Sequence, residues 1–419
     1  MDHFTLKNGT LHCEDVALAD IAAAVGTPVY IYSRATLARH ARVFRDALAA
    51  LPKYHIAFAV KSNPNLAVLR LLAKEGYGAD VVSGGEMDRA LAAGMASADI
   101  VFSGVGKTAA EMRAGLAVGV GQFNLESEEE GAELAGIAVE MGQRAVATLR
   151  VNPDVDAGTH AKISTGKAEN KFGVAYDKAA DIYARLAALD GLDMRGLAVH
   201  IGSQITDLAP SKAAFAKMGA LMRDIRARGF NITHMDLGGG LGVPYRAAET
   251  LPGPAEYGAM VADVTRDWDA MIMFEPGRVI TGNSGVLLTE VIRVKPGSVN
   301  PFVVVDAAMN DLVRPAMYDA WHDIIAVSPT GATMTANVVG PICESADTFA
   351  MAREMDALAA GDLAVFRTAG AYGATMANTY NSRALVPEVM VDGDKWAIVA
   401  ARIEPATILA AETVPDWLL

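Results

Sequence analysis

Cysteine and basic residues are both scarce in this chain of 419 residues. Only two cysteines occur, Cys13 and Cys343, and they lie far apart in the sequence. This excludes a disulfide framework and favours a reducing, cytoplasmic compartment. Lys and Arg number 36 against 49 Asp and Glu, which gives a net charge of −13. A field of that sign repels phosphate backbones, so nucleic acid is not expected as a partner.

Signals for export, membrane insertion and metal binding are also missing. The first four residues have neither the basic nor the apolar region of a signal peptide. The longest uncharged run, residues 324–343, contains prolines and glycines. These residues are energetically unfavourable in a membrane-spanning helix, so we expect strands and turns there and no membrane association. Histidine and cysteine do not recur at ligand spacing, so no metal site is predicted.

Apolar residues are plentiful, at 52% of the chain against 20% charged residues, and the mean hydropathy is +0.23. This is the balance of a globular enzyme and not that of a disordered chain. The length predicts two or three domains with substantial cores.

Short apolar runs alternate with helical stretches through residues 29–278. There are eight such runs, at 54–60, 79–83, 100–104, 122–126, 147–152, 196–202, 234–239 and 271–277. Helical spacing over 128–141, 176–189 and 211–228 separates some of them, and Ser211 is expected to cap the last of these helices. Eight strand–helix units in succession predict an α/β fold, a (β/α)₈ TIM barrel, in preference to an open doubly wound sheet.

The pattern changes after residue 278. Further strands with few helices between them are expected at 285–295, 301–306, 336–340, 362–368 and 387–400. Residues 4–15, which include an Asn-Gly turn, are expected to add strands to this region. We therefore predict a second, mostly β domain that comprises residues 1–28 and 279–419.

Enzymes with this barrel work at the C-terminal ends of the strands, where this sequence has polar residues. They are Lys61, Ser83, Asn152, His200, the triglycine Gly238–Gly240 and Glu275. Partial desolvation at the mouth of the barrel would favour the neutral, nucleophilic amine of Lys61. A solvated loop lysine is the alternative, but the other polar strand ends on the same rim favour a chemical role.

Three glycines in succession offer backbone N–H groups that a phosphate can approach closely. The segment 104–108 also ends like a phosphate-binding loop, in Lys-Thr, but its first glycine is missing, so its last two residues are expected to cap the next helix. A rim lysine, a phosphate cradle, Glu275 and His200 together predict pyridoxal 5′-phosphate as cofactor. Glu275 would keep the pyridine nitrogen protonated. Without this context, His200 would be read as a buried core histidine.

Six segments together resemble the alanine-racemase-like, fold-type III family of pyridoxal-phosphate enzymes, and within it the diaminopimelate decarboxylases. They span residues 58–63, 79–86, 199–204, 236–240, 275–278 and 340–345. The resemblance covers nearly the whole chain. It implies decarboxylation of meso-2,6-diaminopimelate to L-lysine and carbon dioxide, the last step of lysine biosynthesis.

The resemblance also implies roles for individual residues. Lys61 would form the imine with the cofactor, His200 would stack on its ring, and Glu275 would pair with the pyridine nitrogen. Cys343 would donate a proton to the substrate carbanion, although a free cysteine packed as a small hydrophobe is the commoner case. The implied cofactor-binding set is Lys61, Asp80, His200, Ser203, Gly238, Gly239, Gly240, Glu275, Gly277, Arg278 and Tyr372.

Specificity for the substrate depends on fewer residues. Arg278, Arg314 and Tyr318 could clamp the distal carboxylate, Glu344 could pair with the distal ammonium, and Tyr372 would lie near both cofactor and substrate. Arg314 and Tyr318 are four residues apart and would be neighbours on a helix, although a solvated helix face gives the same spacing.

Two alternatives remain open at this point. A decarboxylase of the ornithine, lysine or carboxynorspermidine type shares the fold, but its substrate has no distal carboxylate to engage the arginines if it is ornithine or lysine. A non-catalytic protein that binds pyridoxal phosphate would have no need for Cys343, Glu344 and Tyr372. The resemblance further implies a homodimer with shared active sites, in which the loop of Cys343 and Glu344 reaches the partner's barrel.

Overall fold

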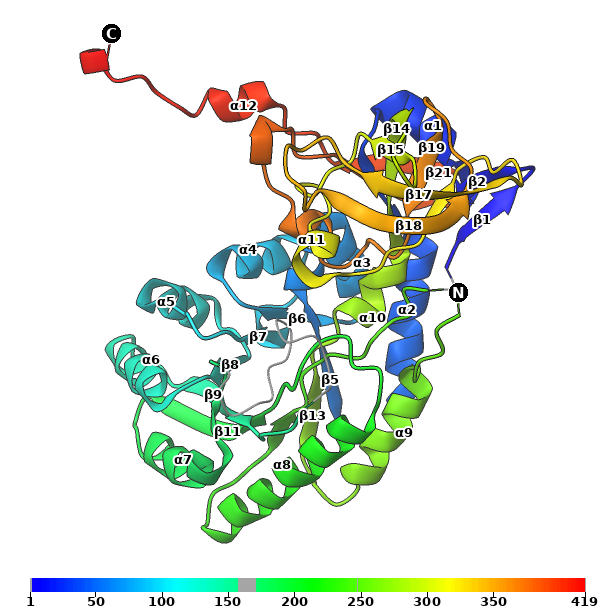
Figure 1. Cartoon of the computed structure of the whole chain (residues 1–419). Helices are drawn as coiled ribbons and strands as arrows, with labels where there is room; N and C mark the ends of the chain where they lie inside the picture. Colours follow the sequence, from blue (N-terminus) through cyan, green and yellow to red (C-terminus); the bar gives the residue numbers. More distant parts are fainter. Residues whose placement is uncertain (1, 157–170, 247, 419) are drawn as a thin grey trace. The chain divides into compact units, whose positions relative to one another are not determined.

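The computed structural model describes residues 2–156, 171–246 and 248–418 (Figure 1). The chain divides into two compact units. The barrel unit comprises Ala38–Pro244 and Thr250–Ile280, and the sheet unit comprises Met1–Leu37, Tyr245–Glu249 and Thr281–Leu419.

Eight parallel strands close the barrel unit into a ring. In their order around it they are β5 (Tyr54–Ala59), β6 (Gly78–Val81), β7 (Ile100–Phe102), β8 (Gln122–Leu125), β9 (Ala145–Asn152), β11 (Leu192–Ala198), β12 (His234–Asp236) and β13 (Met271–Phe274). Pairing of β13 with β5 and of β8 with β9 completes the ring, and β10 (Val174–Ala175) adds a short extra pairing to β9. Both the predicted barrel and its eight strands are confirmed.

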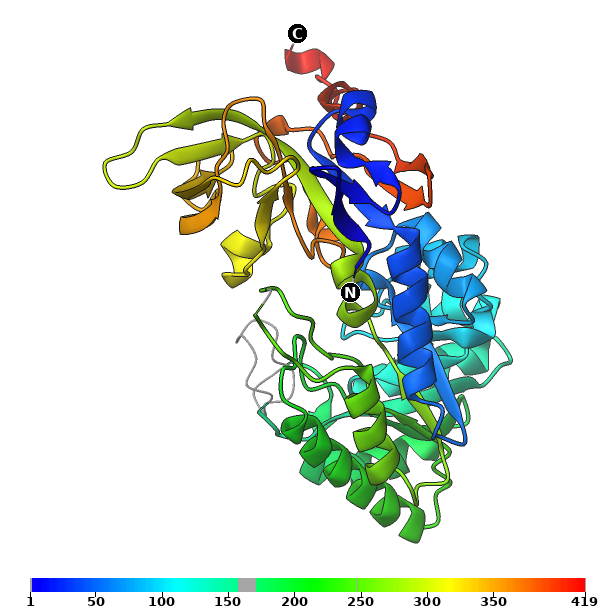
Figure 2. The same ribbon diagram turned by 90° about the vertical axis from the view of Figure 1, so that its right-hand side faces the viewer.

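Helices surround this ring in both views (Figures 1 and 2). They are α3 (Leu66–Lys74), α4 (Gly84–Ala92), α5 (Ala109–Val118), α6 (Glu128–Glu140), α7 (Ala179–Ala187), α8 (Ala209–Ala227) and α9 (Pro254–Val264). Two more helices, α2 (Arg34–Ala47) and α10 (Arg278–Thr281), each contain a point at which the chain passes from one unit to the other.

Side-chain caps start several of these helices directly after a strand. Asn65, Ser83 and Ser127 each accept a hydrogen bond from a backbone N–H of the first turn. Thr108 forms a capping box with Glu111, which confirms the cap expected at this position. The cap predicted at Ser211 is wrong, because α8 begins at Ala209 with a proline in its first turn, and Ser211 is buried inside the helix.

The sheet unit contains a nine-stranded sheet. Its members are β4 (Val29–Ser33), β14 (Gly285–Lys295), β15 (Phe302–Val305), β16 (Ile324–Ala326), β17 (Thr333–Val339), β18 (Thr348–Asp356), β19 (Leu363–Phe366), β20 (Glu388–Asp392) and β21 (Lys395–Ala400). The short helices α11 (Arg314–Tyr318) and α12 (Pro405–Leu409) also belong to this unit. A mostly β second domain is thus confirmed.

One detail of the expected organisation differs from the structure. Strand β4 pairs with β14 and β20. It therefore belongs to the sheet unit, and the barrel unit begins at Ala38 and not at residue 29. The expected strands within residues 4–15 are present in the sheet unit: β1 (Phe4–Lys7) and β2 (Thr10–Cys13) form a separate three-stranded sheet with β3 (Val16–Ala17), and α1 (Leu18–Val25) follows.

Apolar side chains from the N-terminal sheet, α1 and the large sheet pack into one core. Leu18, Ile21, Ile31 and Leu288 are fully buried there. Burial of this kind is the main stabilising contribution to such a unit. None of the helices in the described residues is long and apolar enough to cross a membrane.

Candidate active site

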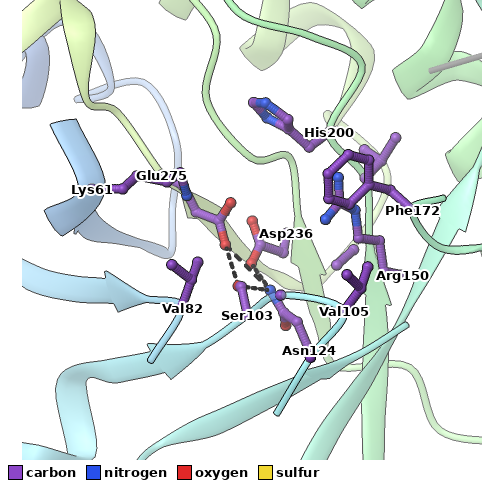
Figure 3. Close-up of a pocket in the computed structure, with 14 residues that line it drawn as sticks. Lys61, Val82, Ser103, Val105, Asn124, Arg150, Phe172, His200, Asp236 and Glu275 are labelled. Atoms are coloured by element: carbon purple, nitrogen blue, oxygen red, sulfur yellow. Dashed lines mark hydrogen bonds between the residues drawn. The ribbon is translucent and has the colours of Figure 1, made fainter. Parts of the chain in front are cut away.

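A cavity of about 400 Å³ lies within the barrel unit, at the C-terminal ends of its strands. Figure 3 shows the side chains that line it. They are Lys61, Val82, Ser103, Gly104, Val105, Gly106, Asn124, Arg150, Phe172, Ala198, Val199, His200, Asp236 and Glu275. Every strand of the ring contributes a residue at, near or just past its C-terminal end, which is where active sites of this fold lie.

Lys61 reaches this cavity from the 3₁₀ turn η1 (Val60–Ser62), which directly follows β5. Its Nζ donates to Asp80 Oδ2 at 2.5 Å, and the Asp80 side chain is completely buried. The second oxygen of this carboxylate, Oδ1, is buried and has no hydrogen-bond partner in the described structure. The lysine side chain is 39% exposed, so a small molecule in the cavity can reach it.

Two carboxyl groups, those of Glu275 and Asp236, lie together at the floor of the cavity (Figure 3). Asn124 Nδ2 lies 3.2 Å from Glu275 Oε1 and 3.1 Å from Asp236 Oδ2. Ser103 Oγ lies 3.3 Å from the same Glu275 oxygen, and the backbone N–H of Gly238 donates to Asp236 Oδ1 at 2.9 Å. The two acids therefore share one hydrogen-bonding centre, the amide of Asn124.

The orientation of the Asn124 amide is set by its own neighbours. Gln122 Nε2 donates to Asn124 Oδ1 at 2.8 Å, and Thr148 Oγ1 donates to the same oxygen at 2.5 Å. With two donors at Oδ1, the Nδ2 group must face the two acids.

Burial dominates the electrostatics of both acids. It raises the pKa of Glu275 well above its usual range, and the nearby Asp236 and Asp80 add to this effect. Burial likewise raises the pKa of Asp236, against the hydrogen bonds from Gly238 and Asn124. Two adjacent buried carboxylates cannot both be charged cheaply, so this floor favours a cationic group above it.

His200 is neutral in this environment. Burial, assisted by the positive charges of Arg150 and Lys61, lowers its pKa to about 3. The backbone N–H of Gly239 donates to His200 Nδ1 at 3.2 Å, which assigns the ring proton to Nε2.

The glycine-rich turns next to these residues leave no space for side chains. A Cβ at Gly239 would lie 2.1 Å from the carbonyl oxygen of Glu275, and one at Gly277 would lie 3.0 Å from Ser62 Cβ. Gly240 has a φ of +107°, which other residues rarely adopt. The structure also brings Arg278 and Ser203 together, with Nη2 donating to Oγ at 3.1 Å.

Four polar residues of the cavity were not predicted from the sequence: Ser103, Asn124, Arg150 and Asp236. Arg150 is itself held by an ion pair of 2.6 Å with Glu126. The signal that could have found them is a polar residue near the C-terminal end of an otherwise apolar strand.

Lys107 has a structural contact that its sequence motif did not reveal. Its fully buried Nζ lies 2.6 Å from Glu130 Oε1 and donates to the carbonyl oxygens of Gly104 and Asn124. It thereby ties the loop after β7, which lines the cavity, to strand β8.

Five of the predicted residues lie in the sheet unit: Arg314, Tyr318, Cys343, Glu344 and Tyr372. Arg314 and Tyr318 are the first and last residues of α11. Arg314 is buried, with its Nη1 2.9 Å from His322 Nε2 and its guanidinium over the Tyr245 ring. Because a guanidinium only donates, His322 accepts at Nε2 and donates from Nδ1 to the Arg367 carbonyl at 2.8 Å.

Cys343 and Glu344 are exposed on a loop that Asp347 holds in shape. The buried Asp347 carboxylate accepts hydrogen bonds from the backbone N–H groups of Met309 and Ile342, each at 2.7 Å. This carboxylate connects the loop to the segment that precedes α11. Tyr372 has a positive φ of 56°, between Gly370 and Gly373.

The donor set of the barrel cavity fits pyridoxal phosphate and offers little to a metal ion. In the described residues, no group of three or more His, Cys, Asp or Glu side chains could hold a metal. A lysine for an imine, a buried acid pair for a cationic ring nitrogen, and bare glycine backbone beside Arg278 and Ser203 for a phosphate are the groups this cofactor needs.

Comparison with known proteins agrees with this fit. Residues 34–282 match the family described as "Pyridoxal-dependent decarboxylase, pyridoxal binding domain". The chain is 51% identical to a diaminopimelate decarboxylase of Zymomonas mobilis and 48% identical to one of Vibrio cholerae, over 99% of each chain.

Solved structures give the same result. A diaminopimelate decarboxylase of M. jannaschii has a TM-score of 0.96 and 33% identity, covering 100% of this chain and 99% of that one. The enzyme of Helicobacter pylori has a TM-score of 0.91 and 36% identity, covering 94% and 98%. A lysine/ornithine decarboxylase of Vibrio vulnificus is only 21% identical and shares the fold. The chain therefore belongs to the pyridoxal-dependent decarboxylases and, among them, to the diaminopimelate decarboxylases, lyases that form lysine from 2,6-diaminopimelate.

Proposed function

We propose that pyridoxal 5′-phosphate binds in the barrel cavity through Lys61, and that diaminopimelate loses one carboxyl group there. The observation that carries this proposal is the placement of the Lys61 amine and a buried pair of acids in one cavity. The bound cofactor supplies a conjugated ring that accepts the electron pair left behind by departing carbon dioxide. The protein's own groups bind, orient and protonate.

Each group of the barrel site has a distinct task in this proposal. Lys61 holds the cofactor covalently, and Asp80 positions its amine through the contact at 2.5 Å. Glu275 keeps a negative charge next to the ring nitrogen, and the neutral His200 packs against the ring face. The phosphate is held by Ser203 and by backbone groups of Gly238, Gly239, Gly240, Gly277 and Arg278.

Arg278 of the barrel unit and several residues of the sheet unit bind the substrate in this proposal. Arg278, Arg314 and Tyr318 bind the distal carboxylate, and Glu344 pairs with the distal ammonium. Cys343 returns a proton to the carbon that has lost the carboxyl group, with Tyr372 close to both partners. Relatives from Helicobacter pylori and M. jannaschii have been solved with L-lysine, the product that this reaction would form.

A homodimer with shared sites completes the proposal. Cys343 and Glu344 are exposed on an ordered loop, and an exposed pair of this kind can serve a neighbouring subunit. Each site would then combine Lys61 of one subunit with Cys343 of the other. We also propose a cytoplasmic location, because both cysteines are free and a reducing compartment keeps them so.

Treatment of the purified, cofactor-loaded protein with borohydride should attach the cofactor irreversibly to Lys61. Peptide mass mapping measures the labelled position, and Lys61→Ala should abolish both the label and the release of carbon dioxide. Lys53→Ala, which changes an exposed lysine, is the matched control and should change neither. A label on Lys107 or Lys171 would refute the assignment.

Arg314→Leu should weaken turnover of diaminopimelate on the order of 10⁴-fold, because the distal carboxylate of the substrate would then enter the site without its charged partner. Any residual activity on lysine or ornithine, which lack the distal carboxylate, should change far less. The measurement is release of carbon dioxide from meso-diaminopimelate and its isomers, lysine, ornithine and arginine. Arg293→Leu, on the exposed face of β14, serves as control. Equal losses on all substrates would indicate a purely structural arginine.

Subunit mixing tests the shared site. Lys61→Ala and Cys343→Ala chains, each inactive alone, should regain activity after they are dissociated and reassembled together. Random pairing makes about half of the dimers mixed, and each mixed dimer has one intact site, so about a quarter of all sites should work. Native mass spectrometry counts the mixed dimers. Mixed dimers without activity would show that each chain builds its own site.

A further inference from the structure

We propose that Asp236 and Glu275 act as one unit that carries a single negative charge, with Asn124 as the positioning residue that bridges them. This inference rests on the proposed role of Glu275 and extends it to two residues that do not themselves contact the cofactor in that proposal. Burial raises the pKa of Glu275 further than that of Asp236 when nothing faces them. A positively charged ring nitrogen beside Glu275 would draw the negative charge to that residue, so that Asp236 keeps the proton.

The amide of Asn124 bridges the two acids in a fixed orientation. Asn124 Nδ2 lies within 3.2 Å of an oxygen of each acid, and its orientation is fixed by Gln122 and Thr148. An amide held from behind by two donors cannot turn its oxygen toward the acids. The bridge therefore always presents N–H groups to both carboxyl groups, and it holds their oxygens near one point.

The position of the two acids inside the barrel makes it costly to charge both of them. Asp236 is buried, and Glu275 is half-buried where it lines the cavity beside it. Moving one carboxylate into such a site is costly, and a second one beside it adds repulsion at low dielectric. A shared proton relieves both costs, as it does wherever two carboxyl groups occupy one site.

The surrounding charges do not offset a second negative charge. Lys61 and Arg150 face the pair from η1 and β9, but each already has a carboxylate of its own, Asp80 and Glu126. Asp80 faces the pair from β6 and disfavours further negative charge. From the helical layer, Tyr257 of α9 approaches as a neutral phenol, and burial raises its pKa further.

The free energy of unfolding of the cofactor-loaded protein should report the shared proton. Both acids have raised pKa values in the folded state. The folded pair therefore keeps its proton after the unfolded chain has lost it, and stability falls as pH rises above the unfolded carboxyl pKa of about 4. One retained proton makes the unfolding constant rise by about tenfold per pH unit in this window.

Asp236→Asn removes the second acid at nearly unchanged shape. Between about pH 5.5 and 7.5, the variant should lack the tenfold rise of the unfolding constant per pH unit that the retained proton causes in the unaltered protein. Glu275→Gln should reduce the slope in the same way, so the test holds even if one variant folds poorly. Glu133→Gln, an exposed acid on α6, is the control and should leave the slope unchanged. The cofactor titrates in all of these proteins, so the difference in slope isolates the pair.

Turnover separates the two acids. Asp236→Asn should lose less than about tenfold, because it replaces one neutral group by another, whereas Glu275→Gln should lose on the order of 10² to 10⁴. Equal slopes in all variants, or an Asp236→Asn variant as inactive as Glu275→Gln, would overturn the proposal. Failure of the proposed reaction is distinguishable, because the unaltered protein would then release no carbon dioxide while the slopes still reported the pair.

Discussion

Burial of two acids side by side is the constraint on which the rest of the barrel site depends. Asp236 is the last residue of β12, and Glu275 directly follows the neighbouring strand β13. Both side chains line the cavity. Such a floor is costly unless protons, hydrogen-bond donors and a cation compensate for it. Asn124, Ser103 and the N–H of Gly238 provide the donors. In the proposed function a protonated ring nitrogen would provide the cation, so the same pair of acids that is costly to bury would favour binding of the cofactor.

The wall of the cavity follows from how the barrel strands end. Short apolar strands stop at polar or glycine residues, and the next helix is capped within a few residues by Asn65, Ser83 or Thr108. Lys107 adds a buried ion pair with Glu130 that fixes the loop after β7. These local devices bring the loops to one rim without long connections.

Much of this architecture could be predicted from the sequence. Buried parallel strands are near-continuous apolar runs, so all eight barrel strands were visible, and their polar ends identified Lys61, His200 and Glu275. Strand β18 was missed because several of its residues, among them Met351 and Ala352, face outward and obscure the apolar pattern. The start of the barrel unit could not be predicted from the sequence, because the strands that pair with β4 lie more than 250 residues away in the chain and nothing local to β4 indicates them. Asn124 and Asp236 were missed because the strands were expected to run to residues 126 and 239, which put both residues inside a strand, whereas the strands end at Leu125 and Asp236.

The affinity for an altered cofactor measures the attraction between the buried negative charge and the ring nitrogen. In the 1-deaza analogue of pyridoxal phosphate, carbon replaces the ring nitrogen and no cation can face Glu275. The protein should bind this analogue roughly 10- to 100-fold more weakly than the natural cofactor, because a hydrogen bond to a charged group is lost. In Glu275→Gln the two affinities should converge. Equal affinities in the unaltered protein would contradict the claim that a buried negative charge selects the cofactor.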